Sequence, residues 1–493
     1  MINFHRTPRR PLSLCFACIL IAATPFAAAQ TLARPGWAGS GITTDLWWKR
    51  AIIYQVNPAD FNPTDGSGLH SITQRLDYIH SLGTDAVLLT HLQPDPTHAE
   101  TIDPALGSLD DFDDLLREAS SRHLRVLLDL DPAIPAADLP NVTRFWLNRG
   151  IAGFHVSGVN EAARDQAATL RSTAAGYLGQ RILIADADPN LTATAQPQPQ
   201  PQPATRGRHH AHARSRKQSS TGTTTHDFTT LDTQSPQLLL DDRMGAITTL
   251  NAAAIRPIID RLQEIQQAGH SLPLLATDGP SFTRSMSRYA DGHHDLAIAK
   301  LLATLLFTTR AESLIYYGQE LGVRTSSSAD APTPLILWDA PPPAKPAPVS
   351  ETYVPYKPPT TAAGTPPDAT PNAALEDADP ESLLNWYWRL STLHHGNSTL
   401  ASGTSLTVNR DDQNVLVLIR KPKVISANSP VLVLLFNLTA QPVQLSLKAD
   451  TTKLGLRGSF LRTVLRSDNG IGTMHLDDMT LAPYAAYIGE LRY

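Results

Sequence analysis

The chain has 493 residues, of which 42 % are hydrophobic and 18 % are charged. This composition supports a large core and excludes a wholly disordered chain. With 41 basic and 46 acidic residues the formal net charge is −5, and this balance argues against a nucleic-acid binder, which would carry a strongly basic domain. The length suits about three domains, or one barrel of about 250 residues with additions.

The N-terminal segment has the order of features that is typical of an export signal. Three arginines precede an apolar run at 12–26, and small residues at 27–29 supply an A-x-A cleavage site. We therefore predict a signal peptide at 1–29 and an exported (periplasmic or secreted) product. The alternative is an uncleaved membrane anchor, although the run is shorter than the roughly 20 residues of a membrane span. Both cysteines, Cys15 and Cys18, lie in this segment, so the mature chain would have no thiol chemistry.

From residue 51 to about residue 320, short apolar runs typical of strands alternate with segments whose apolar residues recur at helical spacing. This alternation predicts a parallel sheet covered by helices, and the seven or eight units fit a (β/α)8 barrel. No run after the leader is long enough for a membrane span in the mature chain. Strands are predicted at 51–56, 86–92, 126–130, 153–159, 181–187, 272–276 and 313–317. Helices are predicted at 72–82, 109–123, 142–147, 248–268, 296–309 and 381–394.

Two segments, 192–236 and 339–380, interrupt this pattern. The first contains a Pro-Gln repeat, a His- and Arg-rich tract and a Ser/Thr run, and the second is rich in proline. Neither has the apolar periodicity of a core, so both are predicted to be disordered or extended low-complexity insertions. His209, His210 and His212 could ligate a metal, but they have no accompanying carboxylate or cysteine set, and we favour a solvated basic tract.

Beyond residue 395 the sequence pattern changes to short β-like runs that are separated by turn residues. This spacing predicts a small antiparallel all-β domain at the C-terminal end. The runs lie at 405–408, 415–419, 431–437, 443–447 and 485–491.

Several segments match one known family in fixed order. They include WWKRAIIYQVNPADFNPTDGSG at 47–68 and VTRFWLNRGIAGFHVSGV at 142–159. Together they resemble the α-amylase family (glycoside hydrolase family 13), and most closely its α-glucosidase and trehalose-synthase branch. The resemblance implies an α/β fold, with a (β/α)8 TIM barrel at 45–395 and a C-terminal antiparallel β-sandwich domain at 396–493. It also implies an α-glucan or a small α-glucoside as ligand. Further matches lie at 76–92, 107–132, 287–292, 297–322 and 379–393.

The resemblance places the family's nucleophile, an aspartate in the motif G-F-R-I-D, at the end of the fourth strand. Here the motif is Gly153-Phe154-His155-Val156-Ser157. Ser157 therefore occupies the nucleophile position, and His155 occupies the arginine position. A serine hydroxyl is neutral at pH 7 and does not stabilise an oxocarbenium-like centre as a carboxylate does. We assign His155 to substrate binding.

Two aspartates remain at positions that the resemblance assigns to catalysis. Asp186 stands where the family has its general-acid glutamate, but its side chain is one methylene shorter, and a displacement of about 1 Å can lower a rate about 100-fold. Asp278 matches the family's transition-state aspartate, without the histidine that precedes it there. Tyr54, on the first strand, is predicted to offer an aromatic platform to a sugar.

Few possible metal ligands are kept. The first loop is similar to a metal loop of the family, but only Asn62 and Asp65 remain as oxygen ligands, fewer than the six to eight that calcium takes. After the third strand, Asp129 alone is kept from the family motif D-x-x-x-N-H. We therefore predict no metal and no other cofactor.

Three hypotheses follow for the function. The favoured one is an exported, catalytically degenerate member of the family that binds sugar or a protein partner of unknown identity. The first alternative is an active α-glucoside hydrolase or transglycosylase with relocated carboxylates, for which Asp186, Asp188 and Asp278 lie near strand ends. The second alternative is a non-catalytic scaffold protein that presents the Pro-rich and basic insertions.

Overall fold

The structure is a computed structural model that describes the barrel and the C-terminal region. Several predicted features lie outside the described residues: the leader at 1–29 with both cysteines, Asn62 and Asp65, the histidines at 209–212, and most of both insertions. The described residues are 46–61, 68–188, 235–325, 336–339, 370–426, 428–468 and 470–493.

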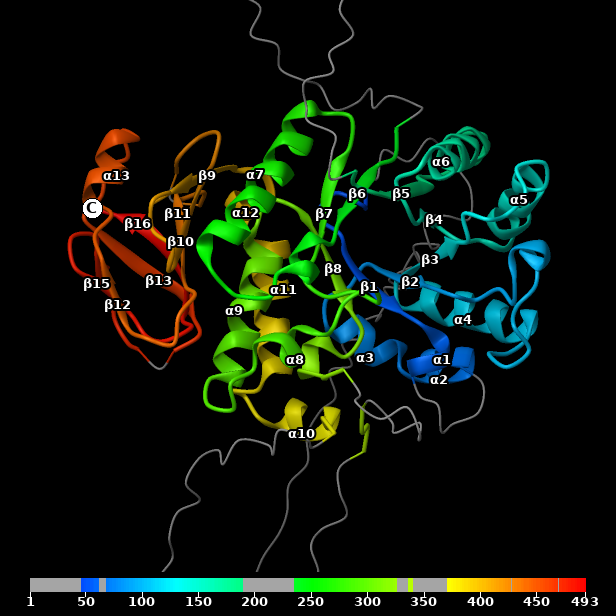
Figure 1. Cartoon of the computed structure of the whole chain (residues 1–493), viewed down its shortest axis with the longest axis horizontal. Coiled ribbons are helices and arrows are strands. Elements are labelled where there is room, and N and C mark those ends of the chain that lie inside the picture. The colour runs from blue at the N-terminus through cyan, green and yellow to red at the C-terminus, as the bar shows by residue number, and fades with distance from the viewer. Residues whose placement is uncertain are drawn as a thin grey trace, which may run out of the picture.

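Eight parallel strands close into a barrel in which each strand pairs with the next and β8 pairs with β1 (Figure 1). The register continues around the ring, for example from Ile53 to Ala86 and from Ile184 to Leu238. The predicted TIM barrel is confirmed. The strands are β1 (Ile52–Val56), β2 (Ala86–Leu89), β3 (Arg125–Leu130), β4 (Gly153–Val156), β5 (Ile182–Asp186), β6 (Leu238–Asp241), β7 (Leu272–Ala276) and β8 (Glu312–Tyr316).

Helices surround the barrel, and local capping explains where they begin. At the start of α4, Ser108 Oγ accepts from the Asp111 amide at 3.2 Å, while the Asp111 carboxylate accepts from the Ser108 amide at 2.8 Å. In the described part of the chain, no helix is both long and apolar enough to cross a bilayer. The helices are α1 (Pro58–Phe61), α2 (Gly68–Gln74), α3 (Leu76–Ser81), α4 (Leu109–Ser121), α5 (Leu139–Arg149), α6 (Glu161–Ala174), α7 (Ala252–Ala268), α8 (Ser285–Tyr289), α9 (Asp295–Thr308), α10 (Ala373–Ala378), α11 (Leu383–Gly396), α12 (Ser398–Ser402) and α13 (Lys448–Lys453), with 3-10 turns η1 (Pro96–His98), η2 (Arg243–Ala246) and η3 (Gln319–Leu321).

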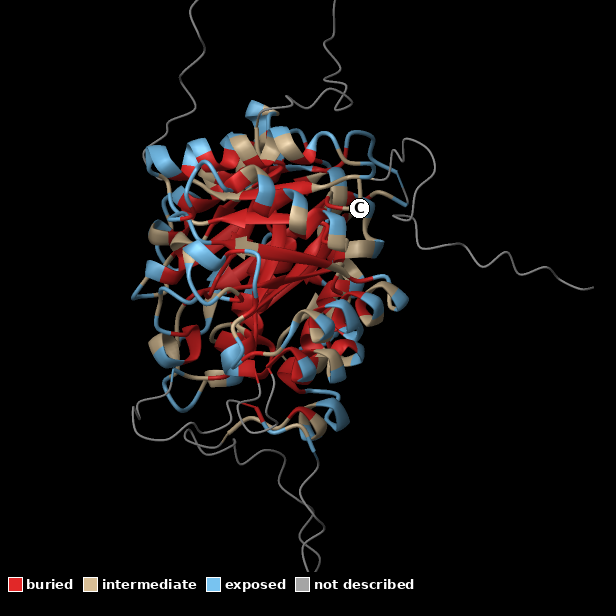
Figure 2. Cartoon of the chain, turned by 90° about the vertical axis from the view of Figure 1, so that its right-hand side faces the viewer, coloured by how far each residue is buried: buried red, intermediate tan, exposed pale blue. Residues whose placement is uncertain are grey.

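Successive side chains of each barrel strand point to opposite sides of the wall. One set, which includes Ile53, Leu88 and Leu127, packs inside the barrel as an apolar core of its own. The other set, which includes Ile52 and Tyr54, packs outward in the core shared with the helices. Both sets are apolar and buried, as is typical of parallel strands covered on both faces. Figure 2 shows the buried strands inside the helical layer.

The structure contains two barrel elements, β6 and α6, that the sequence pattern does not predict. β6 has four residues, Leu238–Asp241, and comes soon after the first insertion, so its apolar run is too short to indicate a strand. α6 buries a face made largely of alanine, including Ala163 and Ala167, which gives a weak apolar period. These two elements complete the alternation of strand and helix around the barrel.

An antiparallel sheet follows the barrel, and the predicted C-terminal β-sandwich is confirmed. Alternate residues of β10 face two cores: Leu416 and Leu418 join the large core of the barrel and its helices, whereas Val415 and Val417 join a second core with Met479 of β15. The order of the main sheet is β14-β13-β16-β11-β10-β9, and β12 pairs with β15. The strands are β9 (Thr404–Val408), β10 (Val415–Lys421), β11 (Leu432–Asn437), β12 (Val443–Leu445), β13 (Phe460–Arg466), β14 (Met474–His475), β15 (Met479–Leu481) and β16 (Ala486–Arg492).

Two buried arginines join the barrel to this sheet. Nη2 of Arg256, on α7, donates to the carbonyl oxygens of Asn409 at 2.8 Å and of Val415 at 3.1 Å. In the opposite direction, Arg420 of β10 is fully buried and donates from Nη1 to the carbonyl oxygen of Thr308, at the end of α9, at 2.7 Å. Hydrogen bonds to charged donors are among the stronger ones, so the two regions are tied together at their backbones.

Glu312, at the start of β8, is a buried acid. It lies two residues before Leu314 of the inner core, and it is 8 % exposed. Burial, together with the charge of Asp85, raises its pKa to about 8 against the opposing effects of Arg50 and Arg420. The Glu312 carboxyl is therefore mostly protonated at neutral pH.

We predict that Glu312 makes the folded chain less stable as the pH rises. Its pKa is about 8 in the folded state, compared with an ordinary value of 4.5. Between these values the folded chain keeps a proton that the unfolded chain has lost, so stability decreases as the pH rises through this window. Glu312→Gln, which is neutral at every pH, should flatten the decrease. Melting temperatures at roughly pH 5, 7 and 9 would measure the effect.

Glu100→Gln is the matched control, because Glu100 is exposed. This substitution should leave the pH dependence of melting unchanged. If the Glu312→Gln protein loses stability with pH as steeply as the wild type, the burial of Glu312 does not control this part of the stability.

Candidate binding site at the barrel mouth

The carboxyl ends of the barrel strands carry a layer of polar side chains. Inward-facing residues recur at every second position of a strand. The next inward position after the apolar inner residues of a strand therefore lies at the mouth, and there it is polar. Enzymes with this fold place their sites at this end of the barrel. The residues that continue the inner set are Gln55 after Ile53, Asp129 after Leu127, Asp186 after Ile184, Asp242 after Leu240, Asp278 after Ala276 and Tyr316 after Leu314.

An ion-pair chain links three neighbouring strands in this layer. His155 of β4 lies between two carboxylates: its Nδ1 is 2.7 Å from Oδ1 of Asp129 on β3, and its Nε2 is 3.2 Å from Oδ1 of Asp186 at the end of β5. The strand register aligns Asp129 with His155, and His155 with Ile184. Two residues predicted for the site, His155 and Asp186, are therefore in direct contact.

The two carboxylates keep His155 charged. Burial alone would lower its pKa, but the hydrogen bonds and charges of Asp129 and Asp186 outweigh burial and raise the pKa to about 10. For Asp186, burial acts to raise the pKa, but the His155 imidazolium and the Gly158 amide, which donates to Oδ2 at 2.6 Å, lower it. At neutral pH Asp186 is thus an ionised carboxylate, whereas a general acid needs a raised pKa.

Ser157 follows β4 and is hydrogen-bonded to the ion-paired residues Asp129 and His155 through Asp129. Its Oγ donates to Oδ1 of Asp129 at 3.3 Å, and this oxygen also faces His155. An activated serine nucleophile needs a base that is free to take its proton. Because Asp129 is already paired with an imidazolium, the Ser157 hydroxyl is one more donor to a satisfied carboxylate.

Asp278 is buried, and both of its carboxylate oxygens are bonded. The Ser285 amide donates to Oδ1 and the Ser285 hydroxyl donates to Oδ2, each at 2.7 Å, while Nη2 of Arg288 lies 3.3 Å from Oδ1. Burial raises the pKa of Asp278 against these contacts. The carboxylate anchors the start of α8, and within the described residues it makes no hydrogen bond to Asp186 or His155.

The expectation that Tyr54 offers a platform to a sugar does not fit its position. Tyr54 belongs to the outward set of β1 and is fully buried between the strand and the helices. Its hydroxyl donates to Oε1 of Glu320 at 2.9 Å, and the Tyr78 hydroxyl donates to the same oxygen at 2.8 Å. The inward neighbour on β1 is Gln55. In this structure Tyr54 is therefore a core residue that holds β1 to α3 through Glu320.

Asp242 is a mouth residue that the sequence pattern does not single out. It is half-buried, and burial, followed by the charges of Asp186 and Asp241, raises its pKa. Within the described residues, its carboxylate has no ion pair and no hydrogen bond to another residue. The signal for Asp242 is the two-residue period that runs from Leu238 through Leu240 to Asp242, and it is visible only when β6 is known to be a strand.

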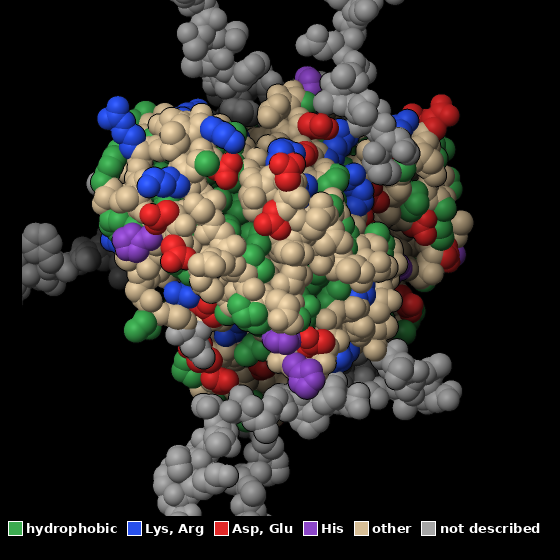
Figure 3. All heavy atoms as spheres, turned by 60° about the vertical axis from the view of Figure 1, so that its left-hand side comes forward, with side chains coloured by type: hydrophobic (Ala, Val, Ile, Leu, Met, Phe, Trp, Pro, Cys, Tyr) green, Lys and Arg blue, Asp and Glu red, His purple; other side chains and the backbone are tan. Residues whose placement is uncertain are grey.

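The described residues show no metal cluster, and one face of the molecule carries charges of both signs. In these ranges no group of three or more His, Cys, Asp or Glu side chains could hold a metal ion. On the face shown in Figure 3, acidic and basic side chains are interspersed. This mixture matches the near balance of the chain's total charge.

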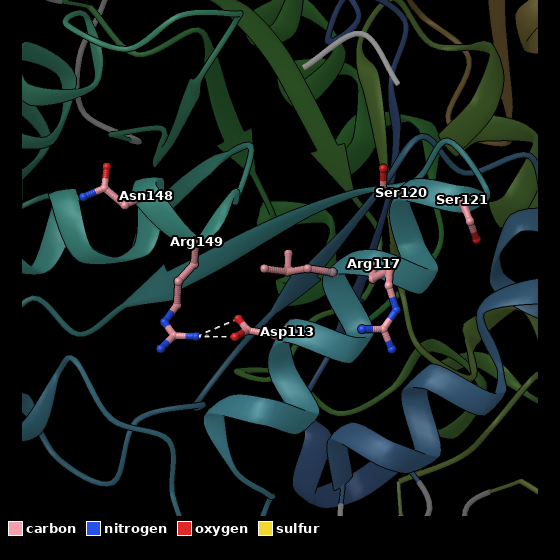
Figure 4. A pocket seen from close by; sticks show the side chains of 7 residues that line it. Asp113, Arg117, Ser120, Ser121, Asn148 and Arg149 are labelled. Carbon is pink, nitrogen blue, oxygen red and sulfur yellow. Dashed lines mark hydrogen bonds and ion pairs between the residues drawn. The ribbon is translucent and has the colours of Figure 1, made fainter. Parts of the chain in front are cut away.

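A surface groove lies elsewhere, between α4 and α5 (Figure 4). Nη1 of Arg149 contacts both carboxylate oxygens of Asp113, at 2.6 and 2.7 Å, so these charges are paired. None of the predicted site residues lines this groove, and we place the candidate site at the barrel mouth. The groove is lined by Asp113, Leu116, Arg117, Ser120, Ser121, Asn148 and Arg149.

Comparison with known proteins finds similarity to one family over part of the chain. The model of a protein family described as "Alpha amylase, catalytic domain" matches residues 55–132. The trehalose-6-phosphate hydrolase of Escherichia coli (strain K12) is 43 % identical over 95 residues, which make up 17 % of this chain and 17 % of the relative. Residues 55–132 of this chain are thus similar to the catalytic domain of the α-amylase family. The match of the chain to this hydrolase spans only a minor part of the relative's length.

Other similarities of this chain extend further. It is 22 % identical over 320 residues to the amino acid transporter heavy chain SLC3A2 of Oryctolagus cuniculus, which covers 59 % of this chain and 52 % of the relative. The crystal structure of Bacillus licheniformis trehalose-6-phosphate hydrolase (TreA) has a TM-score of 0.67 and 16 % identity, and the match covers 91 % of this chain and 100 % of that one. This structural likeness establishes the fold.

We predict that His155→Gln destabilises the barrel most at mildly acidic pH. The substitution removes a buried cation that two carboxylates share, which costs about 3 kcal/mol by analogy with broken buried ion pairs. The contribution of His155 is fully present below its ordinary pKa of 6.5 and is lost as the pH rises through about 10. The contribution of Asp186 is present above its ordinary pKa of 3.8 and is lost at lower pH. Urea unfolding at roughly pH 6 and pH 10 would compare the two conditions.

His270→Gln provides the control, because His270 is exposed. It should change the unfolding free energy by less than about 0.5 kcal/mol at either pH. Equal destabilisation by His155→Gln at both pH values would show that the charge on His155 is not the stabilising feature.

Proposed function

We propose that this chain is an exported α-amylase-family protein that no longer hydrolyses α-glycosidic bonds by the retaining mechanism and that binds an α-glucoside at the barrel mouth. The observation that carries the proposal is the chain Asp129–His155–Asp186, which commits the candidate acid to an ion pair. In addition, Ser157 occupies the position that the family resemblance assigns to the nucleophile.

The retaining mechanism sets requirements that these residues do not meet. It needs one ionised carboxylate as nucleophile and one protonated carboxyl as acid, about 5–5.5 Å apart across the scissile bond. Ser157 has no charge, and Asp186 is ionised and faces His155 rather than a leaving oxygen. Asp278 uses both oxygens to hold Ser285. No predicted catalytic residue therefore has the protonation state and the freedom that its role requires.

The same mouth still has groups that can bind a sugar. Ser157 and Asp242 are half-buried, and the Asp186 side chain is 31 % exposed. Hydroxyl and carboxylate groups at the edge of a concave site exchange hydrogen bonds with ligand hydroxyls without any chemistry. The relatives named as trehalose-6-phosphate hydrolase and as maltase act on α-glucosides, which supports a small α-glucoside as the ligand here.

The similarities in sequence differ in span and in the names of the relatives. The relatives named as trehalose-6-phosphate hydrolase of Escherichia coli and as maltase match in sequence over about a fifth of this chain or less. The relative that matches over 320 residues is named as an amino acid transporter heavy chain. A protein that is similar to this chain over 320 residues thus has a name that refers to transport, and binding of a protein partner at the mouth is an outcome that the test below must distinguish.

Export is the second part of the proposal, and its support comes from the sequence. Basic residues, an apolar run at 12–26 and small residues at 27–29 succeed one another as in a cleaved leader. The remaining chain has no cysteine, which suits either a reducing or an oxidising compartment.

We expect the purified protein to bind an α-glucoside without turning it over. Maltose, trehalose, sucrose and an aryl α-glucoside should each be recovered unchanged. At a concentration of about 100 times the dissociation constant, a bound sugar should stabilise the fold by about 2.7 kcal/mol, measured as a rise in melting temperature. Asp186→Asn should reduce this rise, and Asp477→Asn, at an exposed site in the C-terminal region, should not.

Two outcomes would contradict the proposal. Turnover of any of these sugars that is abolished by Asp278→Ala would show that catalysis is retained. Absence of stabilisation by every sugar, together with capture of a protein partner that barrel-mouth substitutions abolish, would assign the mouth to protein binding.

A further inference from the structure

Asp242 lies beside Asp186 on the inner face of the barrel mouth. The register pairs Asp186 with Leu240, and the Ala187 amide donates to the Leu240 carbonyl at 2.8 Å. Asp242 is two residues beyond Leu240, which belongs to the inner core. Asp242 directly follows the end of β6 and begins the turn η2, and it is close enough to Asp186 for the charge of Asp186 to raise its pKa.

Negative charge is in excess on this side of the mouth. His155 is shared by Asp129 and Asp186, and the Arg243 guanidinium is paired with Asp241 through Nε at 2.9 Å. Among the described residues, the carboxylate of Asp242 has no direct ion pair, although the charges of His155 and Arg243 act on it from a longer distance. Among the described residues on this side, the carboxylates of Asp129, Asp186, Asp241 and Asp242 thus outnumber the cations of His155 and Arg243. The raised pKa of Asp242 is the expected response to burial and to this negative field.

The arginines across the mouth do not compensate for this excess, because both are buried and bonded. Arg288 donates from Nη2 to the Thr277 carbonyl at 3.1 Å and pairs with Asp278. Arg284 donates from Nη1 to the Tyr317 carbonyl at 2.8 Å, and its guanidinium lies over the Tyr317 ring at 4.7 Å. Neither side chain is presented to a ligand anion.

We infer that Asp242 selects ligands by charge, so that the mouth prefers an α-glucoside carrying an amino group over a neutral one and rejects a phosphorylated one. This inference rests on the proposed function, because it specifies the ligand class of the same site. An ammonium group next to Asp242 would complete the missing ion pair and would form a charge-assisted hydrogen bond. A phosphate would add like charge to a partly desolvated acidic wall.

A matched series of sugars tests the preference. Trehalose, 6-amino-6-deoxytrehalose and trehalose 6-phosphate share one scaffold and differ in the charge of one substituent. By titration calorimetry at about pH 8 and low salt, we expect the amino sugar to bind about fivefold tighter than trehalose and the phosphate to bind at least about tenfold more weakly. Raising the salt concentration to about 0.5 M should bring both affinity ratios closer to one, because a shorter Debye length screens the charges.

Asp242→Asn should bring the three affinities to within about threefold of one another, because it keeps the shape of the side chain and removes its charge. Asp477→Asn is the control: it makes the same charge change on the exposed C-terminal region and should leave the series unchanged.

The outcomes separate this inference from the proposed function. If all three sugars bind equally, or if the phosphate binds best, charge selection by Asp242 is wrong while sugar binding stands. If none of the three binds, sugar binding itself is wrong, and charge selection fails with it. If Asp242→Asn leaves an observed preference intact, another residue sets the preference.

Discussion

The alternation of side chains across the wall of a closed parallel barrel is the constraint on which this structure depends. Every second residue of a strand must face the interior, so a single position separates a core residue from a mouth residue. On β1 this rule sends Tyr54 outward to Glu320 and Gln55 inward. On β4 it sends His155 inward, where carboxylates of two neighbouring strands meet it. The chemistry of the mouth follows from that placement.

Under the proposed function, the ion pairs of His155 with Asp129 and Asp186 stabilise the site at the expense of reactivity. A buried imidazolium needs compensation, and Asp129 and Asp186 provide it by staying ionised. A carboxyl that must hold a proton for a leaving group cannot also serve as a permanent counter-ion. With Ser157 in place of the charged nucleophile that the family resemblance implies, one side of the mouth satisfies its own hydrogen bonds and ion pairs. Natural active sites usually accept the opposite compromise between stability and function.

The sequence predicts the barrel well because apolar runs and helical periods are strong and the family motifs keep their order. It fails at β6, where four residues after a low-complexity insertion carry too little signal, and Asp242 is therefore missed. The direction of Tyr54 is also hidden, because both faces of a covered parallel strand are apolar and the period of two disappears. Motif positions locate His155 and Asp186, but their mutual contact depends on the register between strands, which no local pattern encodes.

The two arginines at the junction bear on how such a chain can be divided or recombined. Arg256 reaches from the barrel to backbone carbonyls of the C-terminal sheet, and Arg420 reaches from that sheet to the end of α9. A barrel expressed alone would leave the guanidinium of Arg256 without its hydrogen-bond acceptors. An isolated sheet would expose Arg420 together with the apolar face that surrounds it. A C-terminal domain taken from another protein would therefore have to present carbonyl oxygens to Arg256 and a cation to the Thr308 carbonyl, so the two regions can be exchanged only as a matched pair.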